Sequence, residues 1–486
     1  MIDTLLAVID GFNRFILVYF SFVTVVYFVM TAAAVRGIRR YVRRLGAVDS
    51  AEVLQAAGAP PITVIAPAFN EERSCVQMVQ ALLALDYPDH EIIVIDDGST
   101  DETLDLLGMA FELEPAFRTV TADLPHAPVT ATLQSRNHPN LWVLAKENGG
   151  TADALNAGIN HCQTPLVCRV DADGVLEAEA LVRGVRPFLE DASTVAVGGI
   201  VRVANGCTIE DGRVKEVRLP KSLLAEFQVL EYLRSFYSLR IGWAGFGSTL
   251  LISGAFGIFK RSTLVDAGGF LASSITEDME LTLRLHRHCR ETRQAYEMAF
   301  IPDPLLWTEV PERLRDLGGQ RNRWHRGLID LLVKHRVMFL NPRYGTVGMF
   351  GFPYLVLVEA LGPLIEFIGY FAFVALLVFG DPSPLYIAGF LLLVFGTGAC
   401  LSAATVGLQE LVFRRYHRRS DLIRLSALSV LEVLGHRQIL TYFRFRGLVS
   451  YLSGREGWGT IERKGFEADR ERPLAGAGVS QPEREM

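Results

Sequence analysis

Long apolar regions at both ends of the chain constrain its fold more than any other feature. Residues 15–34 are almost wholly apolar, and further apolar regions cover residues 347–380 and 385–408. A helix rises 1.5 Å per residue, so about 20 residues cross the hydrocarbon of a bilayer. Lipid offers the backbone no hydrogen-bond partners, so a lone segment of this kind is expected to be helical. The sequence therefore predicts helical membrane segments on both sides of the region between them, in agreement with a mean hydropathy of +0.25.

The charges around residues 15–34 favour a membrane anchor over a cleaved signal peptide. Asp3, Asp10 and a single Arg14 precede the apolar segment. A basic cluster follows it, made of Arg36, Arg39, Arg40, Arg43 and Arg44. A signal peptide carries its positive charges before the apolar stretch, and basic loops stay in the cytosol. We therefore expect a multi-pass protein of the cell membrane, with its N-terminus outside and its catalytic domain in the cytosol.

Polar residues interrupt the C-terminal apolar regions. Glu359 and Glu366 lie within residues 347–380. Carboxylates at membrane depth are expected to face protein or a polar path. We expect an interfacial or re-entrant first part and a spanning second part there, a return crossing over residues 385–408, and a broken or surface helix over residues 422–452. From residue 467 the tail is rich in Glu, Arg, Gly and Pro, which predicts disorder.

Between residues 61 and 310, short apolar runs alternate with helical patterns. Strands are predicted at residues 62–67, 91–96, 141–145 and 166–170, and helices at residues 74–85, 103–113 and 152–160. The alternation predicts an α/β fold, with a mostly parallel sheet covered by helices on both faces. Prolines within residues 125–139 predict that the second half of the 104–140 connection is a surface insertion.

Acidic motifs stand where two of these strands end, which is where ligands bind in such sheets. Asp97 follows one strand, and Asp171 and Asp173 follow another. Being two residues apart on extended backbone, Asp171 and Asp173 face the same side. Paired carboxylates favour Mg²⁺ or Mn²⁺ beside phosphate oxygens, although a surface turn with two acids is the alternative. A dinucleotide-binding dehydrogenase is disfavoured, because residues 68–72 lack the glycine-rich turn.

Two later motifs carry further reactive groups. In residues 276–278, Thr-Glu-Asp, a carboxylate can take the proton of an attacking hydroxyl, and the threonine can also cap a helix. Gln320, Arg323 and Trp324 stand at i, i+3 and i+4, so a helix presents them on one face. Arginine binds diphosphate oxygens by two parallel bonds, and tryptophan offers a flat platform for a sugar ring. The same helix also fits a basic interfacial helix on anionic lipid.

These motifs in this order, between apolar segments, resemble the signature of the processive family 2 membrane glycosyltransferases. That group includes the cellulose, hyaluronan, chitin-oligomer and poly-GlcNAc synthases. The resemblance rests on residues 94–100 (VIDDGST), 170–173 (VDAD), 276–278 (TED) and 320–324 (QRNRW), and it covers about residues 62–466. It implies the GT-A nucleotide-sugar fold, Mg²⁺ or Mn²⁺ held by Asp171 and Asp173, and Asp278 as the general base with Glu277 as a helper.

The resemblance also implies binding roles. The implied nucleotide-sugar ligands are Asn70, Glu71, Asp97, Asp171, Gln320 and Arg323, and the implied acceptor-side residues are Trp324, Gly254 and Trp307. Two alternatives stay open: Glu71 as an acid that complements a helix dipole, and Trp307 as a core residue. Thr151 stands where the family often has a lysine after paired glycines, so the identity of the donor is uncertain.

We expect five parts in this chain. They are an N-terminal transmembrane anchor (1–45), a cytosolic GT-A domain (46–315), an amphipathic interfacial helix (316–345), a C-terminal membrane region (346–453) and a partly disordered cytosolic tail (454–486). Six scattered cysteines without metal-site spacing predict reduced structural thiols. A net charge of −6, without a basic aromatic surface, argues against nucleic acid as a partner.

The expected function is inverting transfer of a sugar from a cytosolic nucleotide sugar to a growing polysaccharide, with or without export. By analogy the donor is a UDP-sugar, with GlcNAc or glucose as candidates. One alternative is a single-addition transferase that acts on a lipid or lipid-linked acceptor. Another is a catalytically inactive membrane regulator of the same fold. Export or regulatory subunits are further candidate partners.

Overall fold

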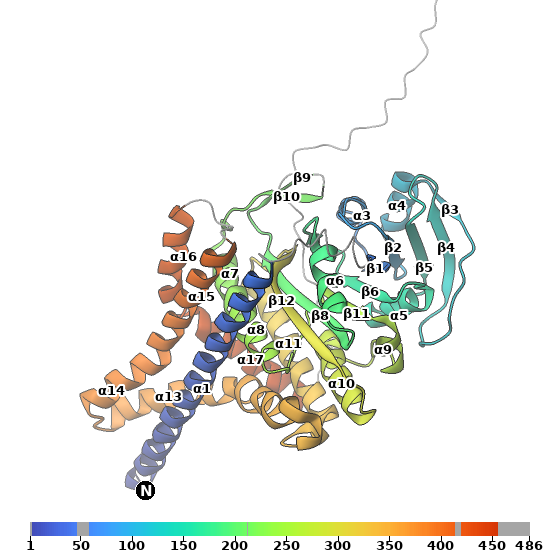
Figure 1. Cartoon of the computed structure of the whole chain (residues 1–486). Coiled ribbons are helices and arrows are strands. Elements are labelled where there is room, and N and C mark those ends of the chain that lie inside the picture. The colour runs from blue at the N-terminus through green and yellow to red at the C-terminus, as the bar shows by residue number, and fades with distance from the viewer. Residues whose placement is uncertain (1, 46–57, 211, 414–418, 455–486) are drawn as a thin grey trace, which may run out of the picture.

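The computed structural model describes residues 2–45, 58–210, 212–413 and 419–454. A long N-terminal helix, α1 (Ile2–Leu45), runs beside the C-terminal helices, and an α/β domain lies to one side of them (Figure 1). Helix α1 packs against α8 (Ile241–Ala244) and α13 (Gly362–Phe379). The predicted disordered tail lies outside the described residues.

The α/β domain is built on one large sheet. Within the described residues it has ten strands in the order β3-β4-β5-β2-β1-β6-β11-β8-β12-β7. Their bounds are β1 (Ile62–Ala68), β2 (His90–Asp96), β3 (Leu113–Pro115), β4 (Val129–Ser135), β5 (Leu141–Lys146), β6 (Leu166–Val170), β7 (Val175–Leu176), β8 (Thr194–Val203), β11 (Phe256–Lys260) and β12 (Glu297–Thr308). A separate hairpin joins β9 (Thr208–Glu210) to β10 (Arg213–Glu216).

The sheet is parallel in its middle and mixed outside it. Strands β5, β2, β1 and β6 pair in parallel, and β11 is antiparallel to both of its neighbours. The α/β fold class is confirmed, but residues 129–135 are not part of a surface insertion. They form β4, which pairs antiparallel with β5. Because proline weakens a strand only from within, Pro128 and Pro139 on either side of β4 leave its ladder intact.

Helices cover both faces of the sheet, as predicted. Side chains alternate along a strand, so Val64 and Ala66 of β1 pack into one core cluster and Ile65 into another. The first cluster includes α3 (Cys75–Leu83), α4 (Thr103–Phe111) and α6 (Ala180–Glu190). The second includes α5 (Thr151–His161), α9 (Arg261–Asp266) and α10 (Glu277–Glu291).

The remaining helices link the domain to the apolar segments. One nearly continuous helix runs through α7 (Leu223–Arg234), the π-helical segment η1 (Ser235–Arg240) and α8. After α11 (Leu314–Lys334), the chain forms η2 (Arg336–Met338), η3 (Pro342–Tyr344), η4 (Val347–Gly351), α12 (Phe352–Tyr354), η5 (Leu355–Ala360), α13, α14 (Pro384–Leu391), η6 (Leu392–Gly396), α15 (Thr397–Phe413), α16 (Arg419–Leu431) and α17 (His436–Leu452).

Three helical stretches of the described chain are long and apolar enough to cross a membrane. They are Val8–Arg44, Val347–Phe379 and Pro384–Glu410, which match the apolar regions of the sequence. Glu359 and Glu366 do face protein, because they pair with Arg444 at 2.7 Å and Arg437 at 2.8 Å. The predicted break within residues 422–452 falls between α16 and α17, where Gly435 has a φ of 112°.

Candidate functional site

A cavity of about 840 Å³ opens beyond the carboxyl ends of β1, β2 and β6. Most of the residues that the sequence predicted for the site line this one cavity: Glu71, Asp97, Asp171, Asp173, Gly254, Glu277, Asp278, Gln320, Arg323 and Trp324. They come from segments up to about 250 residues apart, and the tertiary fold brings them together.

Asp97 is held at one end of the cavity by the loop that precedes α5. Its Oδ1 atom accepts hydrogen bonds from Lys146 Nζ at 2.5 Å and Gly149 N at 3.0 Å, and its Oδ2 atom accepts one from Gly150 N at 2.7 Å. A carboxylate offers about four acceptor sites, so about one remains for a ligand. Lys146 is buried and also pairs with Asp153 at 2.6 Å. This buried cation therefore holds Asp97 in one orientation.

Arg169 lies at the centre of the acidic residues of the site. It projects from β6, and its Nη2 atom lies 2.6 Å from Glu277 Oε1 and 3.4 Å from Asp171 Oδ1. Its side chain is 5% exposed, and its Nε and Nη1 atoms have no hydrogen-bond partner among the described residues. A methyl group on Gly254 would stand 2.8 Å from the Arg169 Nη2 atom, so a larger residue there would have to displace the guanidinium.

Glu277 and Asp278 are neighbours with different electrostatic surroundings. Burial alone would raise the pKa of Glu277, but the guanidinium of Arg169 lowers it below its usual range. The pKa of Asp278 is raised, by burial first and then by the negative charge of Glu277. Asp278 accepts hydrogen bonds from Gly254 N and Met279 N, both at 2.8 Å. Of the two carboxylates, Asp278 therefore has the higher proton affinity.

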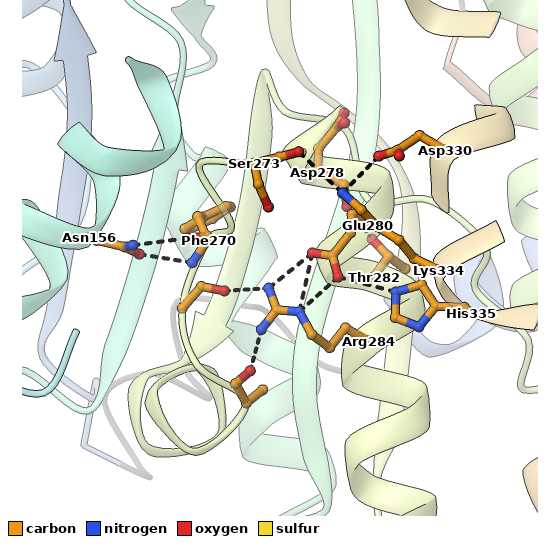
Figure 2. A network of polar contacts seen from close by, with 12 residues as sticks. Asn156, Phe270, Ser273, Asp278, Glu280, Thr282, Arg284, Asp330, Lys334 and His335 are labelled. Carbon is orange, nitrogen blue, oxygen red and sulfur yellow. Dashed lines mark hydrogen bonds and ion pairs between the residues drawn. The ribbon is translucent and has the colours of Figure 1, made fainter. Parts of the chain in front are cut away.

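A polar network fixes helix α10 beneath these acids (Figure 2). Glu280 is 1% exposed and accepts hydrogen bonds from Arg284 Nε at 2.9 Å and His335 Nε2 at 3.1 Å. Arg284 also donates to the carbonyl oxygens of Ala267 and Gly269. The network joins α10 to the loop before it and to the end of α11, which carries Gln320, Arg323 and Trp324.

Helix α11 presents Gln320, Arg323 and Trp324 to the cavity on one face, as the i, i+3, i+4 spacing predicted. Trp324 is 38% exposed, and the guanidinium of Arg321 lies 4.2 Å from its ring centre. Within the described residues, the buried Oε1 atom of Gln320 has no hydrogen-bond partner. This face therefore offers an unsatisfied acceptor and an aromatic surface to a ligand.

Two predicted site residues lie elsewhere. Asn70 does not line the cavity, because its Oδ1 atom accepts a hydrogen bond from Thr100 N at 2.8 Å and so ties two loops together. Trp307 is 1% exposed in a core cluster, and its Nε1 atom donates to Glu177 at 2.8 Å. Side chains alternate along β12, so Thr308 faces the cavity and Trp307 faces away from it.

The structure also settles the alternative for Thr276. It stands at the N-cap position of α10, but its side chain makes no capping hydrogen bond. Its hydroxyl is buried and packs close to Gly327 of α11. The contact between these helices, rather than a cap, determines its position.

Sequence reasoning missed three basic residues of the site, Lys146, Arg169 and Arg240. Lys146 precedes the paired glycines, and Arg169 directly precedes the VDAD motif. The signal for both was their place at the carboxyl end of a predicted strand. Nothing comparable marked Arg240, which lines the cavity from η1.

The fold and the cavity together define a glycosyltransferase with a GT-A fold. The chain belongs to a family described as glycosyltransferase like family 2, whose model matches residues 60–327, more than half of the chain. The solved structure of a mannosyltransferase from Pyrobaculum calidifontis in complex with GDP-Man and Mn²⁺ has a TM-score of 0.51. The match covers 89% of this chain and 99% of the mannosyltransferase chain at 18% sequence identity, which shows likeness of fold alone.

Curated relatives include poly-β-1,6-N-acetyl-D-glucosamine synthases of Staphylococcus epidermidis and Staphylococcus aureus (strain COL). They are 28% and 29% identical to this chain over 273 residues. Each match covers 56% of this chain and 56% of the relative, so it spans little more than half the length of those proteins.

Proposed function

We propose that the protein transfers a sugar from a nucleotide sugar to the end of a growing polysaccharide, with inversion at the anomeric carbon. The observation that carries this proposal is the gathering of all four motifs in one cavity. A UDP-sugar is the proposed donor, and UDP-GlcNAc is the first candidate because the relatives are named as poly-GlcNAc synthases.

On the donor side, Asp97 binds the nucleotide base through its remaining acceptor site, and Glu71 lies beside the ribose. Arg323 and the side-chain amide N–H of Gln320 bind the diphosphate from α11. No lysine follows the paired glycines here. Thr151 instead begins α5 and lines the cavity, so backbone N–H groups at that helix end take part in anion binding.

The residues present fit a divalent cation held jointly with the donor. The described chain has no group of three or more acidic, histidine or cysteine ligands. Asp171 and Asp173 both line the cavity, and Mg²⁺ or Mn²⁺ is often bound by one or two carboxylates plus substrate phosphates. The bound ion would neutralise charge on the departing nucleoside diphosphate.

The proton of the acceptor hydroxyl moves to Asp278. The hydroxyl oxygen then attacks the anomeric carbon as the bond from that carbon to the diphosphate breaks. The single displacement inverts the configuration. A raised pKa makes Asp278 a stronger base while it is ionised. Glu277, paired with Arg169, does not take the proton but raises the affinity of Asp278 for it.

On the acceptor side, Trp324 stacks on a sugar ring, and the Gly254 loop leaves room beside the base. A second cavity of about 380 Å³ lies next to the first and is lined from α1, α13 and α17, among others. It supports the proposal that the growing chain leaves through the membrane region. This proposal places residues 58–315 in the cytosol, α11 at the membrane surface and the three apolar stretches across the membrane.

Product analysis of the purified protein tests the proposed function. The detergent-purified full chain is incubated with Mg²⁺ or Mn²⁺ and, separately, UDP-GlcNAc, UDP-glucose and GDP-mannose, and products are sized by mass spectrometry. We expect a ladder of one repeating sugar, and NMR should show an inverted linkage. A single sugar on a co-purified lipid would instead establish single addition.

Two matched variants test the role of the base. Asp278→Asn should abolish the ladder, whereas Asp105→Asn, at an exposed position on α4, should not. The proposal fails if no donor is used, or if Asp278→Asn transfers sugar at the wild-type rate.

A further inference from the structure

The catalytic cavity meets the second cavity of about 380 Å³, which we call the membrane cavity, at a shared ring of residues. Glu231, Ser235, Arg240, Leu251, Met279 and Trp324 line both cavities. We call this ring the throat. It combines Trp324 of α11 with side chains of α7 and η1, and Asp278 of the catalytic cavity directly precedes Met279 of the throat. A glycan that passes from one cavity to the other must pass these side chains.

Arginines line the membrane cavity, and almost all of them are paired with a carboxylate. The pairs are Arg234 with Glu432, Arg321 with Glu231, Arg437 with Glu366 and Arg444 with Glu359, at 2.7–2.8 Å. Within the described chain, Arg240 is the exception, because no carboxylate lies within ion-pairing distance of its guanidinium. Its Nη1 atom is buried and has no hydrogen-bond partner in the part of the chain that the structure describes.

The local structure holds the Arg240 guanidinium in place but, among the described residues, provides no hydrogen-bond acceptor for its Nη1 atom. Arg240 ends η1, and its Cζ atom lies 4.0 Å from the ring centre of Phe236, one turn earlier. π-Helical turns inside longer helices are often found at functional sites, because they redirect side chains. Burial lowers the pKa of Arg240 to about 10, so the side chain is still charged at neutral pH. The throat thus presents a fixed cation with unused donors.

We propose that Arg240 is an acceptor-binding residue, whose guanidinium donates hydrogen bonds to oxygen atoms of the terminal sugar while that sugar's attacking hydroxyl lies beside Asp278. This inference rests on the proposed function. The ligand atoms are neutral hydroxyl or amide carbonyl oxygens of a glycan. A phosphate at the throat would lie near the negative charge of Asp278 and be repelled. Arg240 therefore selects the sugar end of the acceptor.

Separate measurement of donor and acceptor steps tests this role. Wild type, Arg240→Gln and Arg240→Lys are purified as full chains. Donor binding and donor hydrolysis by water report on the donor side of the site, because neither assay contains a sugar acceptor. Transfer to oligosaccharide primers that the wild type elongates reports on the acceptor. Arg290→Gln is the matched control, because Arg290 also stacks on an aromatic ring, that of Tyr296, but is exposed and lines neither cavity.

We expect Arg240→Gln to raise the KM for the primer at least tenfold, which corresponds to about 1.4 kcal/mol of lost binding. Donor binding and hydrolysis should stay within twofold of wild type. Arg240→Lys should recover part of the loss, and Arg290→Gln should show none. If Arg240→Gln does not fold, the same comparison of primer KM with donor hydrolysis in Arg240→Lys decides the question.

Three results would overturn the inference. One is an unchanged primer KM. Another is an equal loss of donor hydrolysis and primer transfer, which would indicate a structural or donor-side role. The third is a loss confined to acceptors linked to a lipid phosphate, which would assign Arg240 to phosphate. A wild-type protein that binds no nucleotide sugar would instead refute the proposed function itself.

Discussion

Two arginines on helix α10 provide a sharp test of how the helix that carries the proposed catalytic acids is held. Arg284 and Arg287 each pair with a glutamate four residues away on this helix, Arg284 with Glu280 and Arg287 with Glu291. The first pair is buried, with side chains 14% and 1% exposed, and the second is 36% and 35% exposed. We predict that Arg284→Ala destabilises the protein about tenfold more, in free energy, than Arg287→Ala.

The magnitudes follow from burial. Arg284→Ala leaves the carboxylate of Glu280 buried with only His335, and removes the donors to two carbonyl oxygens of the Ala267–Gly269 loop (Figure 2). Loss of one partner of a buried ion pair costs about 3–5 kcal/mol. An exposed i,i+4 pair contributes about 0.3–0.5 kcal/mol. At about 1 °C per kcal/mol for a chain of 486 residues, the expected decreases in melting temperature are about 3–5 °C and about 0.3–0.5 °C.

Thermal unfolding of both detergent-purified variants, at one fixed scan rate, measures the difference between their melting temperatures. Burial alone would raise the pKa of Glu280, but hydrogen bonds from His335 and Arg284 hold it below its usual value. A depressed pKa stabilises the fold above the ordinary glutamate pKa, and this contribution is lost as the pH falls through the depressed value. The difference in melting temperature between wild type and Arg284→Ala should therefore become smaller in acid. Equal melting temperatures for the two variants at neutral pH would refute the reasoning.

Three further predictions concern the site. Transfer requires ionised Asp278 and falls as the pH drops through its raised pKa. Glu277→Gln removes a negative charge that raises this pKa, so its rate–pH profile should shift to lower pH, and a shift to higher pH would contradict the assignment. A chelator of divalent cations should reduce transfer by about 100-fold or more, since a Lewis acid supplies several kcal/mol, and added Mg²⁺ or Mn²⁺ should restore it. Trp307→Phe should lower the free energy of unfolding by about 0.5–1.5 kcal/mol, because the hydrogen bond to Glu177 is lost. The primer KM should stay unchanged. A raised primer KM would instead indicate that Trp307 binds the acceptor.

Much of the fold could be predicted from local patterns. The apolar regions, the central strands and the helices between them follow from hydrophobic periodicity, which acts over a few residues. Strand β4 was missed because prolines surround it, and its pairing with β3 and β5 depends on tertiary contacts rather than on its own composition. The break between α16 and α17 was predictable, because charged residues interrupt an apolar stretch there.

The residues of the candidate site also divide into those that local sequence patterns could place and those that only the tertiary structure could place. Motif spacing placed Gln320, Arg323 and Trp324 on one helix face, because a helix has a fixed period. It did not distinguish Trp307 from Trp324, since alternation along a strand gives a side chain one of two faces and the sequence does not say which face meets the cavity. Only the position of β12 in the sheet decides this.

The sequence by itself determined the apolar helices, the α/β class and the residue types from which a nucleotide-sugar site is made. The tertiary structure alone decided which charges compensate one another. Arg169 pairs with Glu277 across 108 residues of chain, so Glu277 and not Asp278 has the lowered pKa. Among the described residues Arg240 has no such partner, and it lines the throat. The physical reason is that ion pairing depends on distances of a few ångströms and on burial, and residues far apart in the chain reach such distances only when the whole fold is in place.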